Sequence, residues 1–191
     1  METQPQNLFS TNLAERLFEA RTVVISGEIN QEVAGRVISE LTALAVTSDE
    51  PITVYINSPG GHVDSGHAIY DTIRFIRPRV KMIGTGLVAS AGALIYLAAP
   101  REHRFCLPST RFLLHQPAGG VNGRESDVAI EAEQIVRMRE RINRIVARET
   151  GQPLEKVARD TDRNFWLTAE EALEYGLVGC IVGSAAEVPD W

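Results

Sequence analysis

The sequence predicts an α/β domain built around a largely parallel sheet. Two observations lead to that class: short apolar runs rich in β-branched residues alternate with amphipathic helical patterns, and glycine-containing turns follow two of the predicted strands. Hydrophobic residue types make up 44% of the 191 residues, which is enough to bury a core. Because no repeat, low-complexity run or Pro/Ser-rich linker divides the chain, we expect one domain spanning residues 1–191.

Four predicted strands are bounded by glycine, proline or polar residues. They lie at residues 22–26, 52–56, 80–83 and 112–115. Apolar side chains three or four residues apart predict helices between the first three strands, at residues 31–45 and 63–76. This alternation of strand and helix is typical of parallel strands, since each helix crosses back over the sheet.

A longer helix is predicted at residues 126–149, where helical apolar spacing persists for about seven turns. Its apolar positions are Val128, Ala132, Ile135, Met138, Ile142 and Ile145. Ser126 is expected to cap the start of this helix, and Gly151 is expected to close its end. The helix should protrude from so small a domain, and its apolar stripe must be buried against something. Packing across its own domain is one interpretation, and a contact within an oligomer is the one we favour.

Charge and hydropathy argue against several classes of protein. The chain has 19 Lys and Arg residues against 25 Asp and Glu residues, a net charge of −6, which argues against binding nucleic acid or an anionic membrane. The apolar runs are too short to span a bilayer, and no basic region followed by an apolar region marks the N-terminus. We therefore expect a soluble, cytoplasmic protein.

The two cysteines, Cys106 and Cys180, are expected to be buried thiols. Neither belongs to a C-x-x-C motif or lies near a histidine pattern, so the sequence supports neither a disulfide framework nor a zinc site. We expect no metal and no bound cofactor.

Three glycine-containing clusters, at residues 57–61, 84–93 and 115–120, mark the candidate functional site. The first two follow predicted strands, which places backbone N–H groups at the carboxyl ends of parallel strands, where α/β sheets bind ligands. Alone, Ser90 is as consistent with a helix cap as with a nucleophile, and it lacks the flanking glycines of G-x-S-x-G. His115 alone is more often a structural side chain. Together they supply a nucleophile, a base and oxyanion donors.

Five motifs together carry a resemblance to a known family. They are Y-I-N-S-P-G-G at residues 55–61, A-S-A-G-A at 89–93, R-F-C-L-P at 104–108, H-Q-P-A-G-G at 115–120 and A-E-E-A-L-E-Y-G-L-V at 169–178. From about residue 22 to residue 182, the chain resembles the ClpP family, the proteolytic subunits of ATP-dependent Clp proteases, which are self-compartmentalising serine peptidases. The resemblance implies a ClpP/crotonase-like ββα superhelix with a protruding long handle helix. It also implies an N-terminal segment over about residues 1–20 and a handle region over about residues 116–150.

The resemblance implies a role for each candidate site residue. Ser90 would be the nucleophile, His115 its general base, and Asn164 the third member of a triad. The amides of Gly61 and Ala91 would form the oxyanion hole, with Ala91 in place of the family's usual methionine.

Asn164 departs from the family, which normally has aspartate at this position. The carboxylate of a Ser-His-Asp triad fixes the tautomer of the histidine and stabilises its imidazolium form, and an amide has no charge for the second task. We therefore expect a serine endopeptidase that is weakly active alone. The amide oxygen can still accept a hydrogen bond from the ring N–H, and Asp160 or Asp162 are alternative partners for His115.

The resemblance further implies self-association into heptameric rings and a tetradecamer, with the handle helices between the rings. Asp162 and Arg163 would contact the other ring, and a solvated surface ion pair is the alternative interpretation. The chain has no G-x-x-x-x-G-K-[ST] loop, so an AAA+ unfoldase of the ClpX, ClpA or ClpC type would consume the ATP. That partner would deliver unfolded polypeptides, and the peptidase would cut them to short peptides.

Three other functions remain as hypotheses. A regulatory or partly inactive paralogue, working in mixed rings with a second ClpP, would account for Asn164. A crotonase-like acyl-CoA hydratase or isomerase would share the fold and a glycine-based oxyanion hole, but such enzymes rely on carboxylates. A purely structural scaffold would leave Ser90 and His115 unexplained.

Overall fold

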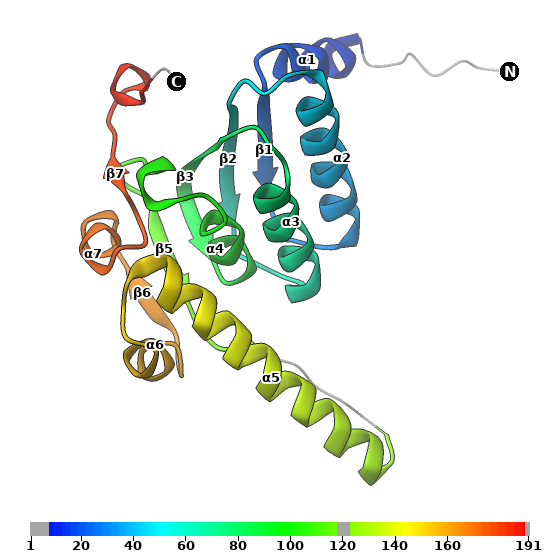
Figure 1. Ribbon diagram of the computed structural model, residues 1–191, viewed down its shortest axis with the longest axis vertical. Coiled ribbons are helices and arrows are strands. Elements are labelled where there is room, and N and C mark those ends of the chain that lie inside the picture. Colours follow the sequence, from blue (N-terminus) through cyan, green and yellow to red (C-terminus); the bar gives the residue numbers. More distant parts are fainter. Residues whose placement is uncertain (1–7, 118–122, 190–191) are drawn as a thin grey trace, which may run out of the picture.

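The computed structural model describes residues 8–117 and 123–189, and its sheet contains seven strands (Figure 1). These are β1 (Thr22–Ser26), β2 (Ile52–Ser58), β3 (Val80–Ala89), β4 (Arg104–Cys106), β5 (Arg111–Leu114), β6 (Phe165–Leu167) and β7 (Cys180–Ile181). Strands β1, β2, β3, β4 and β7 are neighbours in that order, and all of these pairs are parallel. Strand β5 pairs in parallel with the end of β3, and β6 is antiparallel to β5. The predicted α/β class with a largely parallel sheet is confirmed.

Helices connect these strands and cover the sheet. They are α1 (Leu8–Glu19), α2 (Gln31–Thr47), α3 (Val63–Phe75), α4 (Ala91–Tyr96), α5 (Glu125–Thr150), α6 (Leu154–Asp160) and α7 (Ala169–Tyr175), with 3-10 turns at Arg101–His103 and Ala185–Glu187. Helices α2 and α3 join consecutive neighbouring strands, and right-handed crossovers in the same direction place both on one face. Figure 1 shows α2 and α3 side by side and α5 extending away from the rest of the fold.

The core lies between strands β1 to β3 and the helices on that face. Parallel register places Val23 of β1 beside Val54 of β2, and Val54 beside Met82 of β3, so these apolar side chains form a row across the sheet. Leu41 and Leu44 of α2 belong to the same buried cluster. Burial of this row against α2 removes large apolar side chains from water, which is the main force that fixes the layer.

Strand β3 is longer than the sequence predicts. The expected strand at residues 80–83 continues to Ala89, so Gly84 and Gly86 of the 84–93 cluster lie inside the strand rather than in a turn after it. A Cβ atom on Gly84 would lie 3.3 Å from the Val88 side chain, a tight contact, and Gly86 has a φ of 57° opposite Asn57. The pairing of β2 with β3 shifts register at this point, so the two glycines mark an irregular strand and not its end.

Helix α5 begins and ends close to the predicted positions. Its end is confirmed: Gly151 is left-handed with a φ of 75°, and its N–H donates to Ala147 O at 3.0 Å. The prediction that Ser126 caps the start was wrong, because the helix begins at Glu125 and Arg124 precedes it without a side-chain cap. Glu125 and Asp127 in the first turn stabilise the N-terminal end of the helix, because their negative charges interact favourably with the helix dipole. Residues 118–122 of the predicted handle region, and residues 1–7 of the N-terminal segment, lie outside the described residues.

The apolar stripe of α5 divides into two halves. Near the C-terminal end, Ile145 and Val146 are buried against the rest of this chain. Toward the other end, Val128 and Ala132 of the stripe are exposed, and so are Ile130 and Val136 beside it. Packing across the domain therefore accounts for the second half of the stripe, and the exposed half is left for another surface.

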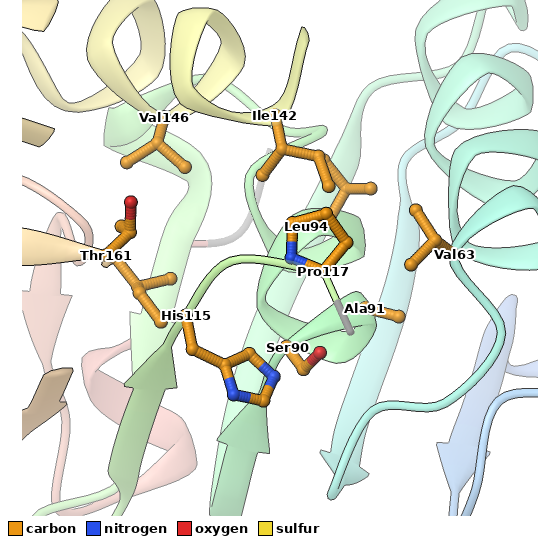
Figure 2. Close-up of a pocket in the computed structure, with 10 residues that line it drawn as sticks. Val63, Ser90, Ala91, Leu94, His115, Pro117, Ile142, Val146 and Thr161 are labelled. Atoms are coloured by element: carbon orange, nitrogen blue, oxygen red, sulfur yellow. The ribbon is translucent and has the colours of Figure 1, made fainter. Parts of the chain in front are cut away.

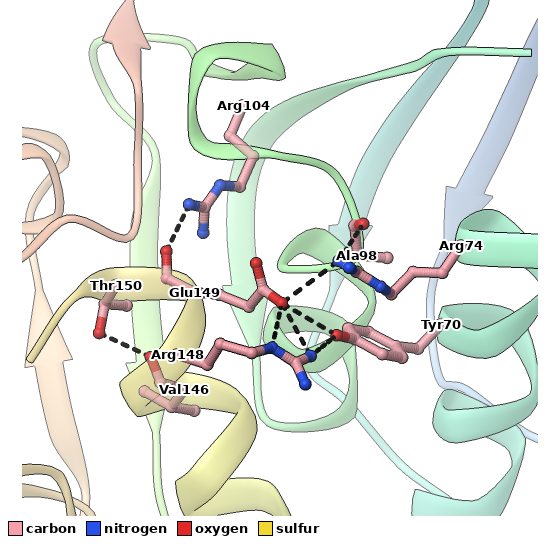
Figure 3. Close-up of polar contacts among 8 residues, drawn as sticks. All are labelled: Tyr70, Arg74, Ala98, Arg104, Val146, Arg148, Glu149 and Thr150. Carbon is pink, nitrogen blue, oxygen red and sulfur yellow. Dashed lines mark hydrogen bonds and ion pairs between the residues drawn. The ribbon is translucent and has the colours of Figure 1, made fainter. Parts of the chain in front are cut away.

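A charged cluster anchors the C-terminal end of α5 to α3 (Figure 3). Glu149 Oε1 accepts hydrogen bonds from Arg148 at 2.8 Å, Arg74 at 3.2 Å and the Tyr70 hydroxyl at 3.3 Å. The fully buried Arg104 donates to Glu149 O at 2.6 Å. Burial and then the Glu149 charge raise the pKa of Tyr70, which keeps its hydroxyl protonated as a donor. These contacts attach the last turn of α5 to the body of the fold.

The prediction of two buried thiols was half wrong. Cys106 of β4 is buried, and burial raises its pKa to about 12. Cys180 is exposed, because it begins the two-residue edge strand β7. Among the described residues, no helix is both long and apolar enough to cross a bilayer.

Candidate active site

Ser90 lies in a strained turn between β3 and α4. Its φ of 53° and ψ of −120° are rare for a residue with a side chain, and its N–H donates to Leu113 O at 2.8 Å. The side chain makes no capping hydrogen bond to α4, which argues against the helix-cap interpretation. This strand-turn-helix geometry presents a serine hydroxyl in the way that a nucleophile elbow does, although the G-x-S-x-G sequence is absent.

Glycines bring the neighbouring loop against Ser90. A Cβ atom on Gly60 would lie 2.5 Å from Ser90 Cβ and 3.1 Å from Ala91 N, so only glycine allows this approach. At Gly61, φ is 141° and a Cβ atom would lie 2.3 Å from Ile29 O. The loop after β2 and the start of α4 therefore meet at the carboxyl ends of their strands, as the sequence predicts.

The backbone N–H groups of Gly61 and Ala91 point away from the backbone hydrogen bonds around them. The parallel bridge between Ile29 and Gly61 uses Gly60 O and His62 N, so the N–H of Gly61 itself points away from Ile29. Ala91 is the first residue of α4, and the N–H groups of a first helical turn have no acceptor within the helix.

His115 and Asn164 meet because of the β5–β6 register. The antiparallel ladder pairs Leu114 with Phe165, so the next residue of each strand, His115 and Asn164, comes opposite the other. His115 Nδ1 lies 3.1 Å from Asn164 Oδ1. That hydrogen bond requires the ring proton on Nδ1, which leaves Nε2 as a proton acceptor.

Neither neighbouring aspartate replaces Asn164 as the partner of His115. Asp160 is paired with Lys156 at 2.6 Å and accepts from the Tyr175 hydroxyl at 2.9 Å. Asp162 is exposed and is paired with Arg139 of α5 at 2.9 Å. The alternative acids considered from the sequence are thus engaged in ion pairs that hold other parts of this chain.

Ser90 and His115 face one small, mainly apolar pocket (Figure 2). Figure 2 shows the imidazole extending toward the serine, with the apolar side chains above them. The other lining residues are Val63, Ala91, Leu94, Leu114, Pro117, Ile142, Val146 and Thr161. Hydrophobic walls beside Ser90 and His115 would accept an apolar side chain of a ligand.

Several residues of this pocket were not predicted from the sequence. Ile142 and Val146 come from α5, where helical spacing identifies an apolar stripe but does not show which part faces a pocket. Thr161 is buried, and its hydroxyl donates to Asn143 Oδ1 at 3.0 Å.

Asp162 and Arg163, the predicted ring-contact residues, are exposed and lie close to Asn164 in the sequence. Asp162 is paired with Arg139 of the same chain.

Over most of its length the chain is similar to known protease subunits. The chain is 62% identical over 172 residues to "ATP-dependent Clp protease proteolytic subunit 3" of Rhizobium etli, which covers 90% of this chain and 89% of that protein. It is 53% identical over 176 residues to "ATP-dependent Clp protease proteolytic subunit 2" of Pseudomonas aeruginosa, covering 92% and 88%. Both relatives are protease subunits.

The solved structures agree with the fold. An asparagine-to-aspartate mutant of ClpP1 from Listeria monocytogenes matches with a TM-score of 0.87 and 51% identity, covering 93% of this chain and 99% of that one. The structure of ClpP1 from Listeria monocytogenes matches with a TM-score of 0.85 and 52% identity over the same shares. The family model described as Clp protease matches residues 5–185. The chain belongs to the Clp protease family, and its function is that of a ClpP proteolytic subunit.

Proposed function

We propose that this chain is a serine endopeptidase in which Ser90 is the nucleophile and His115 the general base. One observation carries the proposal: Ser90 has strained backbone angles, its side chain does not cap α4, and it lines the same pocket as His115. The ring of His115 is held by Asn164, with Nδ1 3.1 Å from Oδ1. Asn164 serves as the third member of the triad. The amides of Gly61 and Ala91 form the oxyanion hole.

The reaction follows from these positions. His115 Nε2 takes the hydroxyl proton as Ser90 Oγ attacks the carbonyl carbon of the peptide, and the N–H groups of Gly61 and Ala91 donate to the oxyanion. The protonated ring then gives its proton to the leaving amine, which leaves an ester on Ser90. A water molecule, deprotonated by His115, hydrolyses that ester and restores the serine.

Asn164 makes this peptidase weak when it acts alone. The amide oxygen accepts the Nδ1–H of His115, so it fixes the tautomer, but it brings no charge to offset the imidazolium formed during each step. A regulatory or partly inactive subunit in mixed rings with a second ClpP is the second candidate, and Asn164 is the observation that favours it. The described lining of the pocket contains Ser90 and His115 but no carboxylate, which favours a peptidase over a crotonase-like acyl-CoA enzyme.

Assembly and partners follow from the family. We propose a single ClpP-like domain over residues 1–191 that forms heptameric rings and a tetradecamer, with the exposed half of the α5 stripe buried between rings. Asp162 and Arg163 are proposed ring contacts. A cytoplasmic AAA+ unfoldase of the ClpX, ClpA or ClpC type would feed unfolded polypeptides to the chamber.

Covalent labelling tests the proposal directly. A fluorophosphonate or β-lactone probe should label the purified protein at Ser90, and peptide mapping would locate the adduct. The Ser90→Ala variant should lose labelling and all hydrolysis of small fluorogenic peptides while keeping its unfolding temperature. Adding a paralogous ClpP, followed by native mass spectrometry, separates homomeric from mixed rings. Labelling at another residue, or equal hydrolysis by Ser90→Ala, would refute Ser90 as the nucleophile.

A further inference from the structure

Gln116, the residue after His115, binds the backbone of the segment that carries Asn164. Its own N–H donates to Thr161 O at 2.7 Å, and its side-chain Nε2 donates to Asp162 O at 2.7 Å. Both bonds are short for N–H···O contacts, and both reach residues just before Asn164.

The β5–β6 ladder alone does not hold His115 against Asn164. The regular ladder ends at the pair Leu114 and Phe165, so His115 and Asn164 lie just beyond it. The two hydrogen bonds of Gln116 connect the two segments again on the far side of this pair. The histidine and its partner are thus bracketed, by backbone pairing on one side and by the two Gln116 bonds on the other.

The segment that Gln116 grips is itself anchored to α5. The buried hydroxyl of Thr161 donates to Asn143 Oδ1 at 3.0 Å, and Asp162 is paired with Arg139 at 2.9 Å. A hydrogen bond to an anchored carbonyl fixes the position of its donor more precisely than a hydrogen bond to a mobile loop, because an anchored acceptor does not move with the donor.

We propose that Gln116 is a positioning residue for the peptidase reaction, acting on the His115–Asn164 pair through the carbonyl of Asp162. It touches neither substrate nor reacting atoms. The inference rests on the proposed function, and it adds that the side-chain amide of Gln116 sets how well the third residue supports the base.

The Gln116→Glu substitution tests this with little change in shape. It replaces the donating amide with a carboxylate that faces the Asp162 carbonyl, so the bond becomes a repulsion. We expect kcat for a fluorogenic peptide, and the rate of fluorophosphonate labelling at Ser90, to fall about five- to tenfold, with KM changed less than about twofold. The loss corresponds to roughly 1.0 to 1.4 kcal/mol at 1.36 kcal/mol per tenfold. Gln116→Leu, which removes the donor without adding charge, should lose a similar factor.

A matched control exists elsewhere in the chain. Gln152 Nε2 donates to Tyr175 O at 3.0 Å, so Gln152→Glu makes the same change in the same kind of bond outside the pocket. That variant should label at the wild-type rate. Unfolding temperatures and native masses of all variants would show whether each remains folded and assembled.

A double-mutant cycle separates positioning from a general structural role. In the Asn164→Ala background, Gln116→Glu should cost less than about twofold in labelling rate, because the residue it positions is gone. In the Asn164→Asp background the five- to tenfold cost should persist. An equal cost in all backgrounds, or no cost in the wild type, would overturn the proposal. A wild-type protein that does not label at Ser90 would instead refute the peptidase function itself.

Discussion

Replacing Asn164 by aspartate should increase the rate of peptide hydrolysis. The substitution exchanges the amide NH₂ for a charged oxygen and leaves the acceptor atom at its 3.1 Å contact with His115 Nδ1. The charge matters only when His115 becomes an imidazolium, so it stabilises the transition state more than the ground state. The gain should therefore be seen in kcat.

The size of the gain follows from the position of the pair. Two unit charges about 4 Å apart interact by about 1 kcal/mol in water and about 4 kcal/mol at an effective dielectric constant of 20. Asn164 is exposed and His115 is partly buried, which places the interaction between these limits. A value of about 2 kcal/mol corresponds to an increase of about 30-fold, within a range of about 10 to 100. This is smaller than the roughly 10⁴-fold loss that the converse substitution causes in a serine protease whose triad aspartate is buried.

The assay compares kcat of the wild type and of Asn164→Asp on a fluorogenic peptide, at equal native mass. Asn30→Asp is a matched control, because Asn30 caps α2 through its side-chain oxygen and aspartate caps a helix equally well. That control adds the same charge without contacting His115 and should leave the rate unchanged. If Asn164→Asp gives no increase while Ser90→Ala abolishes the activity, the missing carboxylate does not limit this enzyme.

Three further predictions concern stability and thiol reactivity. Gly61→Ala should lower the free energy of unfolding in urea by about 2–3 kcal/mol, because the new Cβ would lie 2.3 Å from a backbone oxygen. The control Gly35→Ala has open space around it in α2 and should raise that free energy by about 0.5–1 kcal/mol. At pH 8 a thiol reagent should modify Cys180 quickly and Cys106 only after unfolding, since burial raises the pKa of Cys106 to about 12 and keeps it protonated; rapid loss of both thiols would contradict this. Glu149→Leu should cost about 1 kcal/mol, because it removes the shared acceptor of Arg74, Arg148 and Tyr70 while the two exposed guanidinium groups can be hydrated instead; an unchanged urea midpoint would show that the cluster does not anchor α5.

The α/β class and most strand positions could be predicted because apolar periodicity reports burial directly. β1 was predicted at its observed residues, and the helix now labelled α5 was predicted within one residue at each end. The end of β3 could not be predicted, since Gly84 and Gly86 read as a turn unless the packing of β2 and β4 around them is known.

The candidate site was less accessible from the sequence alone. Ser90 and His115 follow from their places at strand ends, but the strain at Ser90 depends on a turn that carries no G-x-S-x-G signal. Asn164 was placed by family resemblance, because β6 is only three residues long and its pairing with β5 sets the contact with His115. Gln116 could not be predicted at all, since its partners are backbone carbonyls, which have no signature in the sequence.

The described contacts of α5 with the rest of the chain lie in its C-terminal half, which implies that the hydrogen bonds of the helix do not share a single stability. The last turns are tied to the core through Val146 and Glu149, so their amide hydrogens exchange with solvent only when a large part of the domain opens. The first turns are held by their own backbone ladder and by exposed ion pairs such as Glu133 with Arg137. Such a segment is marginal as an isolated helix and opens locally in a lone subunit. Deuterium uptake along α5 would therefore fall steadily from Glu125 to Thr150, and the slope would flatten wherever another surface covers the helix.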